Sequence, residues 1–172
     1  QHGRGEFLVE QDGAIAHLAG YGTTASGAPV TPDTPMALGS VAKSVTAAGV
    51  MQLVEAGKVD LDRPALDYLP EFTTADPRSA RITVRHLLNQ TSGLADTGFA
   101  EMSLPQPANL DEEMSRLRQA RLVADPGTQW NYHNPNYHVL ARLVERVSGR
   151  PYADYMAANV FTPAGMAHSR MI

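Results

Sequence analysis

Ser40 and Lys43 are the residues in this sequence whose types and spacing could do covalent chemistry. They stand at positions i and i+3 at the start of an apolar stretch, and such positions share one face of a helix. A serine hydroxyl is a poor nucleophile until a neighbouring base takes its proton. A lysine amine can be that base, or assist it, when its neutral form is accessible. The same serine could instead only cap a helix, because serine is a favoured N-cap residue.

A second polar group follows much later in the chain, at Tyr132-x-Asn134. Tyr132 could be a core or rim tyrosine whose hydroxyl finds a partner. Asn134 fits an N-cap for the helix expected after it, and we expect it to serve both as a cap and at the site. Trp130 beside them is predicted to be a packing residue, with substrate stacking as the less favoured alternative.

Two helices must position these groups. Residues 41–56 carry apolar side chains at helical spacing and small or apolar residues on the other faces, which predicts a buried central helix ending at Gly57. Its N-terminus would place Ser40 where backbone N–H groups converge. Residues 135–148 predict an amphipathic helix with Pro135 in the first turn and Gly149 after the last.

The remaining elements are predicted from turn and cap signals. Asp12-Gly13 between two short apolar runs predicts a β-hairpin over residues 7–18, followed by a loop over 23–35. The later predictions are a short helix over 62–68, a polar loop over 73–81, a helix over 84–89 capped by Thr83, a loop over 98–109, a helix over 111–120, a turn at 125–127 and a helix over 152–160.

Composition sets limits on the function. The chain has 172 residues, 43% of them apolar and 19% charged, which predicts a globular chain of one domain or slightly more. A net charge of −4 with interspersed signs gives no reason to expect nucleic acid as a partner. No apolar run reaches the length of about 18 residues that a membrane span needs, and Gln1 begins no signal peptide, so a mature exported protein and a cytosolic one would look alike.

Metal chemistry is not expected either. The sequence has no cysteine, which excludes disulfides and thiolate metal sites. The six histidines form no H-E-x-x-H motif, and His133 and His138 are five residues apart, so they would not share a helical face. We therefore expect no metal and no organic cofactor.

These motifs together resemble the serine β-lactamase and penicillin-binding-protein superfamily, in the branch of class C β-lactamases, D-alanyl-D-alanine peptidases, D-aminopeptidases and related esterases. The similarity runs from about residue 11 to residue 166. Its matches, in order, are residues 11–13, 20–22, 38–43, 52–58, 82–88, 91–94, 126–127, 132–134, 145–149, 151–152 and 163–166. Two departures are Gln90, where histidine is frequent, and Ala164, where leucine is usual; neither position is catalytic in the family.

The resemblance implies a role for each site residue. Ser40 would be the nucleophile that forms an acyl-enzyme, and Lys43 the amine that helps to activate it. Tyr132 would relay the proton to the leaving group, and Asn134 would bind the substrate's acylamino carbonyl or Lys43. The backbone N–H of Ser40 would form half of an oxyanion hole, where the loss of one donor typically costs about 2.7–4 kcal/mol.

The implied fold is α+β, of the β-lactamase/transpeptidase-like type, with an N-terminal β-hairpin and a mainly helical subdomain. The family's third motif, Lys/His-x-Gly on a strand, would lie beyond residue 172. We therefore expect a single incomplete domain over 1–172, with a hairpin and loop over 1–35 and the helical subdomain over 36–172. The missing strands could be cleaved off or not represented, supplied by a second chain, or absent through truncation. The resemblance also favours a periplasmic or secreted location.

The resulting hypothesis is a serine hydrolase that acts through Ser40 on a β-lactam, a D-amino-acid peptide or a small ester. Two alternatives stay open: a penicillin-binding or sensor-like module that acylates without turnover, and a catalytically incomplete fragment. The sequence does not choose between the substrates, because specificity would depend on residues 96–109 and on the missing strands.

Overall fold

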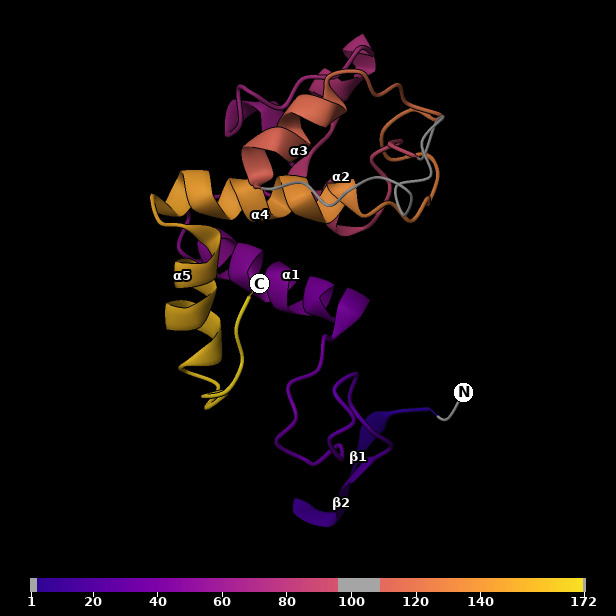
Figure 1. The fold of residues 1–172 in the computed structure, drawn as a ribbon. Coiled ribbons are helices and arrows are strands. Elements are labelled where there is room, and N and C mark those ends of the chain that lie inside the picture. Colours follow the sequence, from indigo (N-terminus) through magenta and orange to yellow (C-terminus); the bar gives the residue numbers. More distant parts are fainter. Residues whose placement is uncertain (1–2, 96–108, 172) are drawn as a thin grey trace. The chain divides into compact units, whose positions relative to one another are not determined.

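A computed structural model describes residues 3–95 and 109–171 of the chain (Figure 1). The predicted loop over 98–109 falls almost entirely outside these residues. The chain forms two compact units, Gln1–Gly39 and Ser40–Ile172. That the chain is a single incomplete domain, with a hairpin and loop over 1–35 and a helical subdomain over 36–172, stays a prediction.

The first unit contains the predicted β-hairpin. Strands β1 (Gly5–Gln11) and β2 (Ala14–Tyr21) pair antiparallel, with a bulge between Val9 and Glu10. Asp12 and Gly13 form the two-residue turn with φ of 54° and 78°, which confirms the primed turn that Asp-Gly predicts. Apolar side chains on the strands stay exposed, with Phe7 64% and Ile15 60% accessible. A two-stranded hairpin of this kind is marginally stable by itself.

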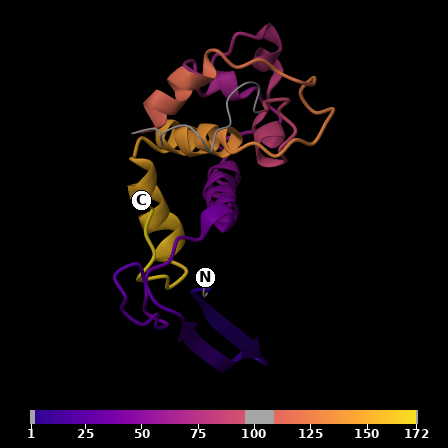
Figure 2. The ribbon, with the colours of Figure 1, turned by 45° about the vertical axis from the view of Figure 1, so that its right-hand side comes forward.

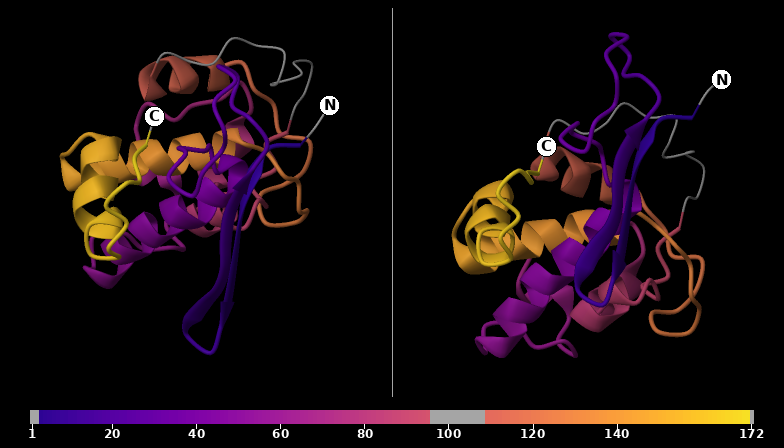
Figure 3. Two further views of the ribbon diagram at one scale, coloured as in Figure 1. Left: turned by 60° about the horizontal axis from the view of Figure 1, so that its bottom comes forward. Right: turned by 90° about the horizontal axis from the view of Figure 1, so that it is seen from below.

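The second unit is helical, and the longest helices within it are α1 and α4. It contains α1 (Ala42–Glu55), α2 (Val84–Leu88), α3 (Leu110–Leu117), α4 (Pro135–Ser148) and α5 (Tyr152–Met156). Short 3-10 turns occupy Gly39–Val41, Ala65–Asp67 and Pro77–Arg81, and a π-helical turn occupies Ala157–Phe161. Helix α4 contacts α1, α2, α3 and α5, and Figures 1, 2 and 3 show it in contact with helices on opposite sides. Together, the hairpin and this helical unit confirm the predicted α+β class.

Helix α4 forms as its sequence predicts. Pro135 stands in its first turn and Gly149, with a φ of 70°, ends it. Its apolar stripe is fully buried, at Val139, Leu140, Leu143 and Val144. Burying a side chain of this size stabilises the fold by about 1.5–3 kcal/mol relative to exposure. The cluster around this stripe includes Val50, Leu53, Leu69, Phe72, Ile82, Leu87 and Met156.

Helix α1 is less buried than its composition predicts. Four of its residues are buried, namely Thr46, Gly49, Val50 and Leu53, but Met51 is 44% exposed. It packs most closely on α4, α5 and the π-helical turn. The predicted burial of this central helix is therefore confirmed for the face that carries Val50 and Leu53 and is wrong for the face that carries Met51.

Several shorter elements differ from prediction. Residues 62–68 form only a 3-10 turn, because Pro64 is extended and the helix starts after it. The polar loop over 73–81 contains a second 3-10 turn that Asp76 caps through the backbone N–H of Arg78. The predicted helix over 152–160 changes at Ala157 from α-helix to a π-helical turn.

Thr83 caps α2 as predicted, because its side chain accepts from the N–H of His86. None of the helices in the described parts of the chain is long and apolar enough to cross a membrane.

Charged side chains on α4 do more than face solvent. Arg142 pairs with Glu145, three positions later on the same helix, at 3.0 Å, and it also pairs with Glu71 at 3.1 Å and Asp111 at 2.8 Å. Burial raises the pKa of Glu71, yet the hydrogen bonds from Arg146 and Arg142 outweigh it and leave the pKa lowered. These bonds connect three parts of the helical unit around α4.

The segment after α2 is held by backbone hydrogen bonds. Thr91 accepts from the N–H of Gly127 at 2.7 Å, and Gly93 accepts from the N–H of Val123 at 2.9 Å. Gly93 has a φ of +84°, and a Cβ built there would lie 2.2 Å from the carbonyl oxygen of Ala124. Gly57 has a similar φ of +68°, with nothing within 4 Å of the equivalent position.

Alanine substitutions at these two glycines distinguish the cost of a strained backbone conformation from the cost of steric overlap. Gly57→Ala should destabilise the helical unit by about 1–2 kcal/mol, the cost of a left-handed conformation for an L-residue. Gly93→Ala should cost about 1–3 kcal/mol more, because the added methyl meets the backbone of Ala124. Urea unfolding followed by circular dichroism measures both. Equal losses for the two variants would contradict the close packing at Gly93.

Asp76 makes the unit's stability depend on pH. Its carboxylate accepts from the side chain of Arg78 at 2.7 and 3.0 Å and from the backbone N–H groups of Arg78 and Leu122. These bonds, the side chain of Arg78 first, hold the pKa of Asp76 well below its ordinary value of 3.8. The stabilisation is therefore fully present above pH 3.8 and is lost as the pH falls below it.

Replacing Asp76→Asn should lower the unfolding free energy at neutral pH. As the pH falls from 5 towards 2, the difference between the parent and this variant should shrink, because the Asp76 carboxylate of the unfolded parent takes up a proton in this range and the unfolded state is favoured. Urea unfolding at a series of pH values measures the difference. A constant difference across this range would show that the charge of Asp76 contributes nothing.

Candidate active site

Ser40 and Lys43 lie together at the beginning of α1. Ser40 belongs to the 3-10 turn before the helix, and the Nζ of Lys43 donates to its Oγ at 3.1 Å. The N-cap residue of α1 is Val41, and no side chain caps the helix there. The reading of Ser40 as only a cap is therefore wrong, and its hydroxyl is engaged with side chains.

The hydroxyl of Tyr132, in the segment before α4, also contacts the hydroxyl of Ser40. Its Oη lies 2.6 Å from the Oγ of Ser40, although the two residues are 92 positions apart. The Nζ of Lys43 lies 4.8 Å from the centre of the Tyr132 ring. The tyrosine is 44% exposed, so the phenol is not a core group and solvent or a ligand can approach it.

Asn134 completes the arrangement. Its Oδ1 accepts from the Nζ of Lys43 at 2.7 Å, so Lys43 bonds to Ser40 and Asn134 at once. Asn134 stands at the N-cap position of α4, but its backbone is helical, with φ −59° and ψ −41°, and its side chain makes no capping bond. The expected double role is therefore wrong. The amide is directed to Lys43 and not to the helix end.

A second tyrosine near Lys43 differs from Tyr132 in its surroundings. The ring centre of Tyr137 lies 5.9 Å from the Nζ of Lys43, and its hydroxyl donates to the carbonyl of Leu88 at 3.0 Å. Burial, and secondarily the neighbouring Tyr132, raises the pKa of Tyr137. This phenol therefore stays neutral and serves as a structural donor, which leaves Tyr132 as the phenol that contacts Ser40.

Two expectations near the site need correction or extension. Trp130 is 69% exposed and its ring centre lies 6.4 Å from that of Tyr132, so its prediction as a packing residue is wrong for this chain. Gln90, noted only as a departure from the family pattern, is buried and bonds to the residues around Tyr132. The sequence feature that could have indicated its role is its position directly before Thr91-Ser92-Gly93, which matches the family pattern.

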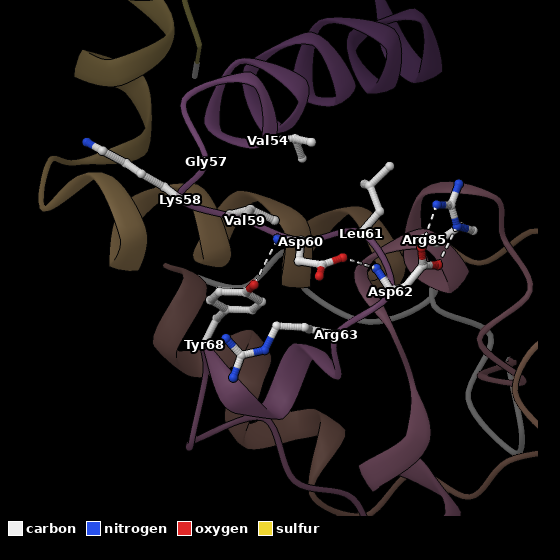
Figure 4. A pocket seen from close by; sticks show the side chains of 10 residues that line it. All are labelled: Val54, Gly57, Lys58, Val59, Asp60, Leu61, Asp62, Arg63, Tyr68 and Arg85. Atoms are coloured by element: carbon white, nitrogen blue, oxygen red, sulfur yellow. Dashed lines mark hydrogen bonds and ion pairs between the residues drawn. The ribbon is translucent and has the colours of Figure 1, made fainter.

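A separate hollow of about 470 Å³ lies at the C-terminal end of α1, the opposite end from Ser40 (Figure 4). Its lining mixes apolar side chains with polar groups that bond to one another: Arg85 bonds to Asp62, and the hydroxyl of Tyr68 accepts from the N–H of Asp60. Within residues 3–95 and 109–171, no three His, Asp or Glu side chains gather closely enough to hold a metal ion.

Comparison with known proteins places this geometry in a family. The profile of the Beta-lactamase family matches residues 5–171. Penicillin-binding protein 4 of Amycolatopsis lactamdurans is 36% identical over 170 residues, which is 95% of this chain and 43% of that protein. Esterase EstB of Burkholderia gladioli is 34% identical over 175 residues, 92% of this chain and 44% of that protein. The chain thus spans less than half the length of these relatives.

A solved structure shows the same fold. The octameric penicillin-binding protein homologue from Pyrococcus abyssi superposes with a TM-score of 0.85 at 30% identity, over 94% of this chain and 39% of that one. The predicted β-lactamase/transpeptidase-like fold, with a hairpin and a helical part, is confirmed. With a family profile that matches nearly its whole length, the chain belongs to the Beta-lactamase family.

Proposed function

We propose that this chain carries the nucleophile of a serine hydrolase and forms an acyl-enzyme through Ser40. One observation carries the proposal: the Oη of Tyr132 at 2.6 Å and the Nζ of Lys43 at 3.1 Å both reach the Oγ of Ser40. A nucleophile within hydrogen-bond reach of a base that a third group orients is the arrangement that covalent catalysis requires. Asn134 is that third group, through its bond to Lys43.

The proposed reaction follows from these contacts. The Oγ of Ser40 attacks the carbonyl carbon of the substrate, and its proton passes as the C–O bond forms either to Tyr132 acting as a phenolate or to Lys43 acting as a neutral amine. In the first route the ammonium of Lys43 stabilises the negative charge of the phenolate before the transfer. The backbone N–H of Ser40 donates to the oxyanion. The bond to the leaving group then breaks, and Tyr132 returns the proton to the departing nitrogen or oxygen. Water releases the acyl group in a second, similar step.

The substrate classes are a β-lactam, a D-amino-acid peptide or a small ester. The names of the relatives support the first and the last of these, since one is a penicillin-binding protein and another an esterase. Asn134 would bind the acylamino carbonyl of an amide substrate. The two alternatives are a module that acylates without turnover and a catalytically incomplete fragment.

We also propose that strands from outside these 172 residues complete the sheet, either from the same polypeptide or from a second chain. The exposed apolar side chains of the hairpin support this proposal, because a hairpin exposed on both faces is marginal in water. The share of 43–44% of the relatives' length that the chain covers is consistent with it.

The nucleophile is tested by Ser40→Ala, with Ser44→Ala as the matched control on the same helix. The hydroxyl of Ser44 donates to the backbone oxygen of Val41 at 2.7 Å, so it is engaged with the backbone at the start of α1. After incubation with a fluorescent penicillin and a chromogenic ester, intact mass should show an adduct on the parent and on Ser44→Ala, and none on Ser40→Ala. Equal labelling of the parent and Ser40→Ala would refute Ser40 as the nucleophile.

The same time course separates the proposed functions. Transient labelling with product release supports the hydrolase, whereas a persistent adduct on Ser40 supports the module that acylates without turnover. If neither reagent labels the parent, the chain is the incomplete fragment and the proposal of activity for it fails.

The proton relay is tested by Tyr132→Phe against Tyr137→Phe. Loss of a positioned acid or base typically slows a reaction by about 10²–10⁴-fold, and we expect a loss in that range for Tyr132→Phe. Tyr137→Phe loses only the bond to Leu88, so its acylation rate should stay within about threefold of the parent. Stopped-flow or gel-based acylation rates measure both. If the two variants slow equally, Tyr132 has no special role.

A further inference from the structure

We propose that Gln90 is a positioning residue that fixes the phenol of Tyr132 on Ser40. This inference rests on the proposed function, because it concerns the same nucleophile. Gln90 lies just after α2 and does not touch Ser40; it acts through the chain segment that carries Tyr132 and Asn134.

Gln90 binds the backbone on both sides of Tyr132. Its carbonyl oxygen accepts from the N–H of Asn131 at 2.8 Å. Its side-chain Oε1 accepts from the N–H of His133 at 3.0 Å. The peptide groups 130–131 and 132–133, on either side of Tyr132, are therefore both bound to one residue, which restricts how far the tyrosine can shift or turn.

The same side chain also holds the start of α4. The Nδ2 of Asn136 donates to the Oε1 of Gln90 at 2.6 Å, and the hydroxyl of Ser92 donates to the Oδ1 of Asn136 at 2.7 Å. Asn136 and Ser92 are fully buried and Gln90 is 6% exposed. Water does not compete well with hydrogen bonds in such surroundings, so this network is rigid. Asn134, the partner of Lys43, lies between the two anchored positions.

The backbone conformation of Gln90 indicates that the surrounding contacts hold this residue in place. Its φ is +60°, and it is the one non-glycine residue with positive φ among the described residues of the helical unit. Such conformations persist where surrounding contacts determine them, and they cluster at functional sites. Glycine would adopt this φ more easily, but it could not make the bonds to His133 and Asn136.

Of the two polar atoms of the Gln90 side-chain amide, the oxygen is the one that makes the hydrogen bonds described above. Its Nε2 is buried and has no hydrogen-bond partner in the described parts of the chain. Glutamate has the same shape and keeps an acceptor oxygen, whereas methionine keeps the volume and loses the acceptor. These two substitutions therefore separate the hydrogen bonds from the packing.

The experiment compares Gln90→Met, Gln90→Glu and a matched control, Gln52→Met. Gln52 is a partly buried glutamine in the C-terminal part of α1, and its Nε2 donates to the carbonyl of Asn159 at 2.7 Å. Both methionine variants lose an amide hydrogen bond, so both should lower the melting temperature. Only Gln90→Met should disturb Tyr132.

Acylation of Ser40 by a fluorescent penicillin is the first readout. A displacement of about 1 Å in a catalytic group can cost about 10²-fold, and we expect Gln90→Met to slow acylation by about 10–100-fold at saturating reagent. Gln90→Glu should recover the rate to within about fivefold of the parent, and Gln52→Met should stay within about twofold. Parental rates in Gln90→Met, or equal losses in the two methionine variants, would overturn the proposal.

The second readout does not depend on activity. In protein labelled with ¹³C at the tyrosine Cζ, the signal of Tyr132 is identified by its loss in Tyr132→Phe. Its chemical shift at a fixed pH should change in Gln90→Met and stay at the parental value in Gln52→Met. If the parent is never acylated, the proposed function fails, and this signal still decides the role of Gln90: an unchanged Tyr132 signal in Gln90→Met overturns it.

Discussion

The contact on which the site depends is the one between the Oγ of Ser40 and the Oη of Tyr132, at 2.6 Å. The two residues are far apart in sequence, so the contact exists only because α1 packs on α4. Each residue lies just before the first turn of one of these helices. The buried face of α4 and the residues Val50 and Leu53 of α1 therefore do more than stabilise the unit. They set the distance between the hydroxyl of Ser40 and the phenol of Tyr132.

Lys43 links the two sides of this contact chemically. Its Nζ donates to Ser40 and to Asn134, and it lies over the ring of Tyr132. A single positive charge thus faces an oxygen from α1 and two groups from the segment before α4. Because a lysine side chain is long and flexible, three partners at once restrict it to one conformation that an exposed lysine would not keep. The same side chain that would help to activate Ser40 in the proposed reaction therefore also connects Ser40 to Asn134.

Local patterns predicted the elements whose signals are local. The Asp12-Gly13 turn, the cap at Thr83 and both ends of α4 needed only the identities of neighbouring residues, and all three are confirmed. The burial of α1 could not be predicted in this way, because apolar composition does not say what covers a face. The side chain of Asn134 was assigned a capping role from its position, but the backbone before α4 is already helical and the amide turns to Lys43.

Gln90 shows most clearly where the sequence stops being informative. A glutamine after a short helix carries no recognisable pattern, and its importance follows only from a positive φ and from bonds to residues more than 40 positions away. Those bonds reach His133 and Asn136, on either side of Asn134. All of the residues involved, like Ser40 and Lys43, belong to the unit from Ser40 to Ile172. The geometry around Ser40 is therefore built from the α1–α4 packing and the buried amide network of the helical unit.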